Sequence, residues 1–501
     1  MTTRVFTAAA AAALVAGAAL VVRFSGTAAG GADSSGYLNS ARMFAAGQLY
    51  ERVRTVPGVK PDAYRPGVFV PLGMRPGRQP LTAVPTYPPG LPLHLAAASL
   101  LIGIGRAPVA VNVIAWVAAT VLLYRLARVL AMPQTWCVTA VLTFTLFPLT
   151  VLQSVRVMSD LLATAWCTAA VAFALRGRKR GAYAVAAGMS FSMAVLVRPT
   201  DALLAPAIAL ALGGSPAAFV PAAVGAAPLL AGLGLYNLAE YGRVFTTGYT
   251  GIAPLVSLTN LPTGLLHFVR WLATFLGVPA LALVGFGLVR AVRGDRRQVV
   301  LLTWAGAIVG FYTLYEQSVY GWWRLRFLLP ALPAFILSAA LAAQELCALA
   351  AERWRSRPVL RRLAAPALAA SLLWALGVSA YWDVTRRVWN VGTSEDVYPR
   401  CVAWSERQLP PNAALLAMQT SGAVYFYGRS PIVRYDLMDE PTYVRFTADA
   451  RRAGVPLYAL LFRNDRVEFD QRWPGSWQRL GGLDEASLWR LAETTAPTAH
   501  R

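Results

Sequence analysis

The sequence predicts a polytopic α-helical membrane protein with a small α/β domain at its C-terminal end. Of its 501 residues, 56% are hydrophobic and 14% are charged, whereas soluble domains carry about 25% charged residues. Apolar stretches long enough to cross a bilayer recur along the chain. Ten of the 24 acidic residues precede Asp383. These observations exclude a soluble enzyme and predict an apolar, basic body over residues 1–382 and a charge-balanced domain over residues 383–501.

The apolar stretches are numerous enough for a polytopic membrane protein. Hydropathy windows of about 19 residues indicate about eleven spans. One of them, over residues 202–212, is too short to be secure alone. The stretches are Val5–Val22, Val109–Leu126, Thr135–Leu152, Leu161–Leu175, Tyr183–Val197, Ala202–Leu212, Ala217–Tyr236, Trp271–Val289, Val299–Leu314, Leu328–Leu346 and Leu363–Trp382.

Basic clusters orient these spans. They lie in alternate short loops, at Arg125 and Arg128 and at residues 176–180, 290–297 and 353–362. Positive charge favours the cytoplasmic side, so we expect a cytoplasmic N-terminus and an extracytoplasmic C-terminal domain. This pattern requires Leu91–Gly105, about 15 residues long, to be an interfacial or re-entrant segment rather than a span.

The first apolar stretch has a second interpretation. Arg4, the alanine-rich core and the small residues after it also resemble a secretory signal. Its apolar run is long for a signal, and no long soluble domain follows, so we favour a retained span. Cleavage would leave the topology unchanged.

The net charge of +22 would suggest nucleic-acid binding in a soluble protein. Here most of the excess lies in the cytoplasmic clusters, so the partner that we expect is the lipid bilayer and not nucleic acid. Nor does the chain contain a phosphate-binding loop, a dinucleotide fingerprint or the cysteine and histidine spacing of a zinc site.

Two larger elements lie on the outer face in this topology. One is the loop over residues 23–108, in which we expect juxtamembrane helices. The other is the tail, which reads as alternating strands and helices of a small α/β domain. The expected elements are strands at Ala413–Met418, Ile432–Tyr435 and Leu457–Phe462 and helices at Ser421–Tyr427 and Thr442–Ala453.

Carboxylates at the outer ends of spans are costly and therefore suggest function. Asp33 and Asp160 both lie beside an apolar span on this face. Each is able to accept a proton from an attacking hydroxyl or to hold a divalent ion. Each is also a good helix N-cap, and the sequence does not decide between the two roles.

Arginines and aromatic residues on the same face are the other binding candidates. Arg198, Arg324 and Arg326 offer the fork of donors that suits phosphate oxygens, although snorkelling to the interface is an alternative. The substrate-binding candidates are Tyr37, Tyr87, His94 and Tyr249.

In layout the chain resembles GT-C-fold glycosyltransferases, the integral-membrane type that uses polyprenyl-phosphate sugars. It also resembles lipid A aminoarabinose transferases and protein O-mannosyltransferases. The resemblance rests on the order and sidedness of several weak motifs over nearly the whole chain. They are Asp33-Ser-Ser-Gly-Tyr37, Tyr87-Pro-Pro-Gly-Leu-Pro92, Ser159-Asp160, Leu196-Val-Arg198-Pro199 and Arg324–Pro330.

The resemblance implies roles for particular residues. Asp33 corresponds to the essential acid of the first outer loop and Asp160 to the second outer acid. Arg198 corresponds to the residue that meets the lipid phosphate, and Arg324 or Arg326 corresponds less surely. The lipid A branch has a Glu-Lys pair before the loop-closing proline, where this chain has Thr86-Tyr87; lipid A modification is therefore in doubt.

We therefore expect an inverting glycosyltransferase in the bacterial plasma (inner) membrane. It would move a sugar from a polyprenyl-phosphate donor to a glycan, lipid or protein acceptor. Asp33 would take the acceptor proton, and the arginines would neutralise the phosphate. Asp160 would orient the acceptor or share a divalent cation, Mg²⁺ or Mn²⁺, with Asp33.

Two other classes of protein fit parts of the pattern. A transporter or flippase would explain the spans and the intramembrane charges, but the internal repeats typical of transporters are not evident. A structural protein of the cell envelope would need no set of outer carboxylates and arginines.

Overall fold

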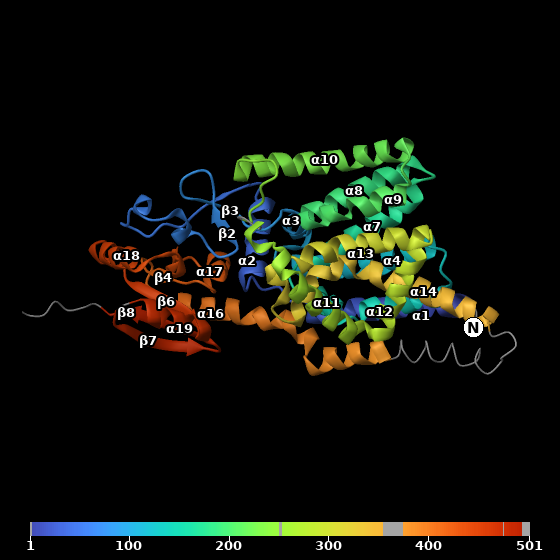
Figure 1. Cartoon of the computed structure of the whole chain (residues 1–501). Helices are drawn as coiled ribbons and strands as arrows, with labels where there is room; N and C mark the ends of the chain where they lie inside the picture. The colour runs from blue at the N-terminus through green and yellow to red at the C-terminus, as the bar shows by residue number, and fades with distance from the viewer. Residues whose placement is uncertain (1–2, 250–252, 354–373, 474, 493–501) are drawn as a thin grey trace, which may run out of the picture. The chain divides into compact units, whose positions relative to one another are not determined.

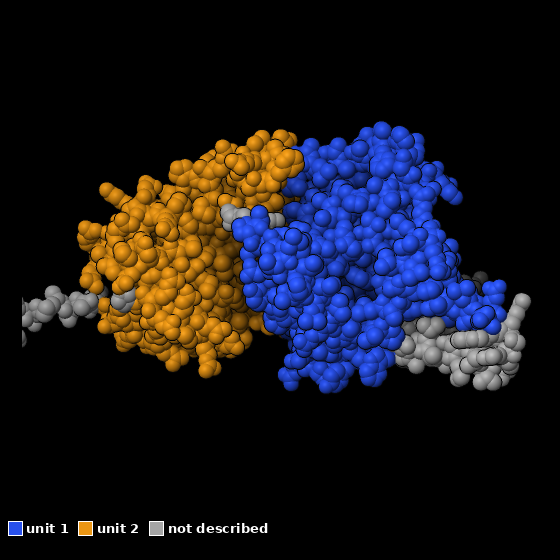
Figure 2. All heavy atoms as spheres, in the orientation of Figure 1, with its two compact units in different colours: residues 1–25, 109–234, 250–392 blue, residues 26–108, 235–249, 393–501 orange. Residues whose placement is uncertain are grey.

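The computed structural model describes residues 3–249, 253–353, 374–473 and 475–492 (Figure 1). The chain forms two compact units (Figure 2). We call residues 1–25, 109–234 and 250–392 the helical unit. Residues 26–108, 235–249 and 393–501 form the mixed unit.

The helical unit is built almost entirely from helices of apolar sequence. Among the described residues its α-helices are α1 (Thr3–Phe24), α4 (Ala107–Val129), α5 (Gln134–Thr145), α6 (Pro148–Ser154), α7 (Asp160–Gly177), α8 (Gly181–Val197), α9 (Ala205–Leu212), α10 (Pro216–Tyr241), α11 (Leu261–Leu276), α12 (Val278–Val292), α13 (Arg296–Thr313) and α14 (Leu332–Arg353). Residues 374–385 are also helical. Helix α4 begins and α10 ends across the division between the two units.

Several of these helices are long and apolar enough to cross a membrane. By length and composition, α4, α10 and the stretch Trp322–Arg353 qualify among the described residues. Two helix pairs qualify together but are bent, by 62° between α5 and α6 and by 114° at the break between α11 and α12. The protein is thus mostly helical with several apolar spans, as expected, and the number eleven stays a prediction.

The breaks have local causes. Pro148 begins α6, and Pro279 follows the positive-φ residue Gly277 at the start of α12. A proline lacks the backbone N–H that a continuous helix needs, and glycine tolerates a positive φ. The expected spans Thr135–Leu152 and Trp271–Val289 are therefore interrupted. The first part of the expected span Leu363–Trp382 lies outside the described residues.

Helix α7 lies at the centre of the helical unit. It packs along α8 and also contacts α9, and most of its residues are buried. Its sequence is rich in alanine, and small residues let helices approach closely in a bilayer. Asp160 at its start and Arg198 just after α8 are therefore attached to a tightly packed pair of helices.

The mixed unit combines the loop over residues 26–108 with the tail. Its α-helices are α2 (Ala32–Ala45), α3 (Gly90–Ile102), α16 (Val397–Glu406), α17 (Ser421–Tyr427), α18 (Glu440–Arg452) and α19 (Arg463–Arg472). Its strands are β1 (Glu51–Arg52), β2 (Met74–Pro76), β3 (Thr82–Pro85), β4 (Ala414–Leu416), β5 (Ile432–Val433), β6 (Leu457–Phe462), β7 (Trp477–Leu483) and β8 (Ala486–Leu491).

The tail is the small α/β domain that the sequence predicts, and its five strands form a mixed sheet. Strand order is β5-β4-β6-β8-β7; β4 runs parallel to β5 and β6, and β8 pairs antiparallel with β6 and β7. Strand β6 and helix α17 have the expected bounds, and α18 is shifted by one or two residues. Strands β7 and β8 are not predicted. No residue of β7 is buried and two of its seven residues are glycines, so it gives little of the apolar signal that marks a strand.

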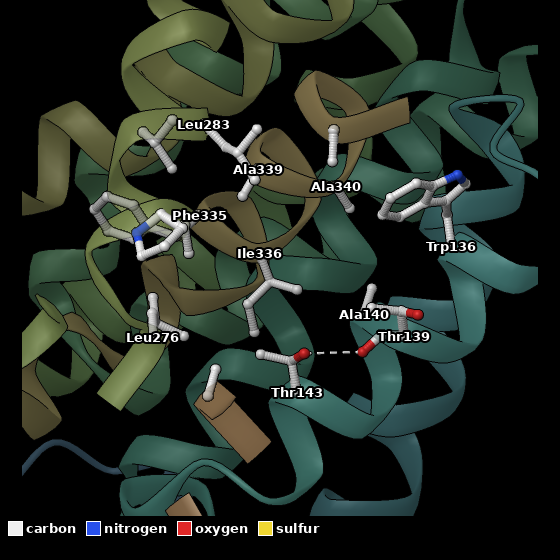
Figure 3. A pocket seen from close by; sticks show the side chains of 15 residues that line it. Trp136, Thr139, Ala140, Thr143, Leu276, Leu283, Phe335, Ile336, Ala339 and Ala340 are labelled. Carbon is white, nitrogen blue, oxygen red and sulfur yellow. Dashed lines mark hydrogen bonds between the residues drawn. The ribbon is translucent and has the colours of Figure 1, made fainter. Parts of the chain in front are cut away.

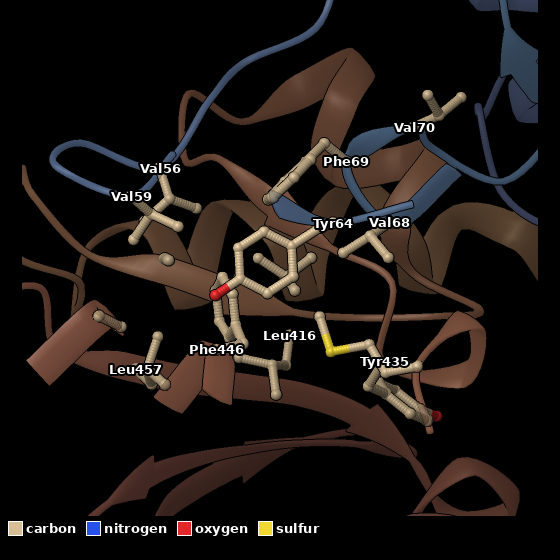
Figure 4. Close-up of a cluster of buried hydrophobic side chains, with 14 of the residues drawn as sticks. Val56, Val59, Tyr64, Val68, Phe69, Val70, Leu416, Tyr435, Phe446 and Leu457 are labelled. Carbon is tan, nitrogen blue, oxygen red and sulfur yellow. The ribbon is translucent and has the colours of Figure 1, made fainter. Parts of the chain in front are cut away.

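Loop and tail share one hydrophobic core. Val56, Val59, Tyr64 and Phe69 of the loop pack with side chains of the tail that include Phe446 (Figure 4). Fully burying a large apolar side chain contributes about 1.5–3 kcal/mol, so the loop over residues 26–108 and the tail stabilise each other.

Candidate functional site

The candidate residues predicted from the sequence fall into two clusters, one in each unit. Asp33, Tyr37, Tyr87, His94 and Tyr249 belong to the mixed unit. The other cluster, Asp160, Arg198, Arg324 and Arg326, belongs to the helical unit.

Asp33 lies in the first turn of α2 but does not cap it. The N-cap position belongs to Gly31, and no side chain accepts a capping hydrogen bond there. A carboxylate in the first turn is favoured by the positive end of the helix dipole. The capping role left open by the sequence is therefore wrong for Asp33, because its carboxylate does not cap α2.

Tyr87 lies close enough to Asp33 for the two groups to interact electrostatically. The Tyr87 ring lies 4.8 Å from that of Tyr37 and 5.9 Å from that of Tyr249, centroid to centroid. Three of the four predicted substrate-binding residues thus form one group, with Tyr87 between the other two. Their exposure differs: Tyr37 and Tyr87 are 3% and 9% exposed, whereas Tyr249 is 40% exposed.

Burial raises the pKa of the Tyr87 hydroxyl far above its usual value, and the negative charge of Asp33 raises this pKa further. Both effects disfavour the tyrosinate. Tyr87 therefore keeps its proton throughout the physiological range.

His94 lies on α3 and makes a local contact. Its Nδ1 donates to the carbonyl oxygen of Gly90, one helical turn earlier, at 2.7 Å. A carbonyl only accepts hydrogen bonds, so this contact fixes the proton on Nδ1. Helix α3 packs against α2 and has 13 residues, which places it among the shorter apolar helices. The interfacial position of Leu91–Gly105 stays a prediction.

Glu395 is a residue that sequence reasoning missed. The Ser34 hydroxyl donates to its Oε2 at 2.5 Å, which places a carboxylate of the tail next to the residue that follows Asp33. Glu395 is 361 positions away in the chain and carries no motif, so the sequence offered no signal for this contact.

In the helical unit Asp160 and Arg198 form a buried ion pair. Arg198 Nη1 lies 2.6 Å from Asp160 Oδ1, and Arg198 and Asp160 are 9% and 2% exposed. Arg198 Nη2 also donates to the Tyr312 hydroxyl at 3.1 Å. Ser159 is the N-cap of α7, and no side chain accepts a capping hydrogen bond there. The Asp160 carboxylate therefore binds Arg198 and does not cap the helix.

Three guanidinium groups converge on one phenyl ring. The Cζ atoms of Arg198, Arg324 and Arg326 lie 5.8, 5.9 and 5.5 Å from the centroid of Phe327. The two later arginines lie with Phe327 in a 3₁₀ segment, Trp322–Ala331, that leads into α14. All three predicted phosphate-binding arginines are thus brought together, and such a group attracts phosphate or carboxylate oxygens.

Asp201 adds a second carboxylate to this region. It is 2% exposed, the Cys167 thiol hydrogen-bonds to it, and Arg198 and Asp160 both interact with it electrostatically. Its Oδ2 has no hydrogen-bond partner in the described part of the chain. The sequence marks Asp201 as one more acid at the outer end of a span but does not indicate a role for it.

The helical unit also contains an apolar groove that is open to the exterior (Figure 3). Its lining includes Trp136, Ile336 and Leu283. The Thr143 hydroxyl faces the groove but donates to the carbonyl of Thr139, so it is already satisfied. The lining therefore suits a hydrocarbon chain better than a polar ligand.

The described residues contain no group of three or more His, Cys, Asp or Glu side chains that could hold a metal ion. Asp33 and Asp160, the pair considered as cation ligands, lie in different units, and Asp160 is paired with an arginine.

No family profile matches the sequence, and no curated protein matches it. Solved structures do. The chain superposes on ArnT from Cupriavidus metallidurans bound to undecaprenyl phosphate with a TM-score of 0.58 at 15% identity, over 98% of this chain and 99% of ArnT.

Two further structures match over most of this chain. The oligosaccharyltransferase AglB from Archaeoglobus fulgidus, in complex with an inhibitory peptide and a dolichol-phosphate, gives a TM-score of 0.54 at 13% identity, over 91% of this chain and 69% of AglB. The mycobacterial arabinofuranosyltransferase AftD gives 0.53 at 14% identity, over 99% of this chain but 40% of AftD. The chain therefore has the GT-C fold of these membrane glycosyltransferases.

Proposed function

We propose that this protein is an inverting glycosyltransferase that moves a sugar from a polyprenyl-phosphate donor to an acceptor hydroxyl at the outer face of the membrane. The observation that carries this proposal is the convergence of Arg198, Arg324 and Arg326 on Phe327. A cationic group among apolar helices is what a lipid with a phosphate head requires.

The likeness to solved structures supports the same class of donor. ArnT was solved with undecaprenyl phosphate and AglB with a dolichol-phosphate, and both ligands are long isoprenoid chains that end in a phosphate. A nucleotide-binding motif is not needed, because the lipid itself carries the activated sugar. The apolar groove of the helical unit offers a surface for hydrocarbon.

In the proposed reaction the acceptor hydroxyl oxygen attacks the anomeric carbon of the sugar. The bond between this carbon and the phosphate oxygen breaks, and polyprenyl phosphate leaves with the bonding electrons. The acceptor proton passes to Asp33. Attack from the side opposite the leaving phosphate inverts the anomeric centre.

The arginines stabilise the charge that develops on the leaving phosphate, and such stabilisation is commonly the largest catalytic contribution. In this proposal Arg198, whose Nη1 atom lies against Asp160, meets the phosphate together with Arg324 or Arg326. In this proposal Asp160 holds Arg198 in place. Tyr249, the exposed member of the tyrosine group, is the one best placed to contact a sugar or acceptor.

The orientation is part of the proposal. The basic loops lie in the cytoplasm, the mixed unit lies outside, and the membrane is the bacterial plasma membrane. A flippase for the same lipid would share the phosphate site but would leave the sugar–phosphate bond intact.

The test is transfer by membranes that contain the Asp33→Asn variant, supplied with radiolabelled polyprenyl-phosphate sugars. Removal of a general base costs about 10²- to 10⁴-fold in rate. Asp62→Asn, which neutralises an exposed acid of the same loop, is the matched control and keeps normal transfer. Normal transfer by Asp33→Asn at equal expression would remove Asp33 from the mechanism. Movement of intact donor without cleavage, in the wild-type protein, would favour the flippase.

A further inference from the structure

Tyr312 lies where three segments of the helical unit meet. It belongs to the last turn of α13 and is 5% exposed. Helix α13 contacts the 3₁₀ segment Pro199–Leu204, which follows Arg198, and also the 3₁₀ segment Trp322–Ala331. The arginines that we assign to the phosphate lie next to or within these two segments, so Tyr312 is in a position to join them.

The hydroxyl of Tyr312 binds Arg198. Nη2 of Arg198 lies 3.1 Å from the hydroxyl oxygen, and Oγ1 of Thr200 lies 2.8 Å from the same oxygen. A guanidinium group only donates hydrogen bonds, so the Tyr312 oxygen accepts from Arg198, and its own proton is available to Thr200. Because Nη1 of Arg198 lies 2.6 Å from Asp160, the two ends of the guanidinium fork are held by two different helices, α7 and α13.

The ring of Tyr312 supports the other two arginines. It stacks on Phe327, with 4.9 Å between the ring centroids and 12° between the ring planes. Arg324 and Arg326 both lie over Phe327. Like charges gathered around one ring repel each other, so the arrangement needs uncharged contacts that keep the ring and the guanidinium groups in place. Tyr312 supplies one such contact to Arg198 and another to Phe327.

We propose that Tyr312 is a positioning residue of the phosphate site. Its hydroxyl, oriented by Thr200, holds Arg198, and its ring holds Phe327, so that the three guanidinium groups meet the phosphate as one preformed set. Charged groups that are fixed before the reaction cost no reorganisation when charge develops on the leaving phosphate. This inference rests on the proposed function, because it concerns the phosphate of the proposed donor.

The test is the binding of two lipid probes, undecaprenyl phosphate and undecaprenol, to the purified protein in mild detergent. The probes share the isoprenoid chain, and only the first carries a phosphate. Tyr312→Phe removes the hydroxyl and keeps the stacked ring. We expect it to weaken the binding of undecaprenyl phosphate by about 10-fold, the lower end of what a hydrogen bond to a charged group contributes. The binding of undecaprenol is unchanged, which a general loss of structure would not allow.

Tyr315→Phe is the matched control. The centroid of the Tyr315 ring lies 5.7 Å from that of Phe327, so this variant removes a neighbouring hydroxyl that is not the one bonded to Arg198. It keeps the wild-type affinity for both probes. A Tyr312→Phe protein that binds undecaprenyl phosphate as tightly as Tyr315→Phe does would overturn the positioning role.

Two further variants separate the two contacts of Tyr312. In the double variant Asp160→Asn/Arg198→Gln, Tyr312→Phe weakens the binding of undecaprenyl phosphate no further, because the hydroxyl has no guanidinium group to hold. An additional, independent loss would contradict this. Tyr312→Leu also removes the stacked ring and weakens the binding more than Tyr312→Phe does. Equal losses in Tyr312→Leu and Tyr312→Phe would overturn the role given to the ring.

Thr200→Val serves if Tyr312→Phe does not accumulate. It removes the hydroxyl that contacts the Tyr312 oxygen, so the oxygen is less well oriented toward Arg198. We expect a weaker binding of undecaprenyl phosphate and an unchanged binding of undecaprenol. Unchanged binding of both probes would overturn the inference.

The outcomes also separate this inference from the proposed function. If the wild-type protein binds undecaprenyl phosphate no better than undecaprenol, the proposed donor is wrong and the role of Tyr312 falls with it. If the wild type prefers undecaprenyl phosphate and Tyr312→Phe prefers it equally, the proposed function stands and the positioning role is wrong.

Discussion

At the scale of single residues, Asp160 and Arg198 carry the largest energetic consequence. Both are buried and their charged atoms are 2.6 Å apart. Taking two charges out of water is costly, and their attraction offsets that cost only while both are present. The pair therefore adds little net stability to the folded protein, but removal of either partner alone is strongly destabilising.

We predict that Asp160→Asn lowers the stability of the protein by about 3–5 kcal/mol, because it leaves Arg198 charged and buried. Thermal unfolding of the protein in mild detergent measures this loss. The double variant Asp160→Asn/Arg198→Gln carries no buried charge at these positions and unfolds at a higher temperature than Asp160→Asn alone. Equal stability of Asp160→Asn and the wild type would show that the pair is not electrostatically coupled.

The sequence predicted the two acids but not the contacts that they make. Asp33 and Asp160 stood out because acids are scarce in the apolar body. Glu395 reaches Ser34 only after folding brings distant segments together. The capping alternative was wrong for both acids because Gly31 and Ser159 occupy the N-cap positions.

At the scale of elements, α2 is held by α17 of the tail. Asn39 donates to the carbonyl of Gly422 at 3.0 Å. Arg42 and Arg54 both donate to the carbonyl of Tyr425, near the C-terminal end of α17, where carbonyls lack intrahelical partners and cations are favoured. Helix α17 follows β4, so the tail sheet supports the helix that carries Asp33.

This contact is close enough to be tested by steric complementation. A Cβ at Gly422 would overlap Oγ of Ser35 and lie 2.7 Å from its Cβ. We predict that Gly422→Ala displaces α2 and lowers transfer activity, and that a second change, Ser35→Gly, restores part of it by removing both atoms.

The single variant Ser35→Gly is the control. It costs about 0.5–1 kcal/mol, because glycine weakens a helix, and it retains transfer. Hydrogen exchange of α2 amides reports the displacement directly. Gly422→Ala with normal activity and normal exchange would contradict the role of α17 as a support for α2.

The sequence predicted elements best where the pattern was local and strong. Residues 457–462 form the expected strand β6 and residues 421–427 the expected helix α17. Hydropathy recognised the apolar stretches but not their breaks, because a window averages over Pro148 and Gly277. It also gave no sign that α2 and α17 pack together, since such contacts depend on tertiary structure.

At the scale of the whole molecule, the GT-C fold is shared with ArnT along nearly the full length of both chains. At 15% identity this likeness establishes the fold and leaves the substrate to be argued from the site. The decisive chemistry is then that of the three arginines around Phe327. Their convergence predicts an anionic head group attached to a long apolar chain.

The binding of a polyprenyl phosphate at these arginines is tested most directly by identifying the lipid that the purified protein retains. This measurement can be made before the sugar and the acceptor are known. Protein is extracted in mild detergent, and its bound lipids are identified by mass spectrometry. We predict polyprenyl phosphate or its glycoside in the wild-type protein, and several-fold less in the double variant Arg324→Gln/Arg326→Gln. Retention of bulk phospholipids alone, or an amount of polyprenyl phosphate that is unchanged in the double variant, would contradict binding of this lipid by the arginines.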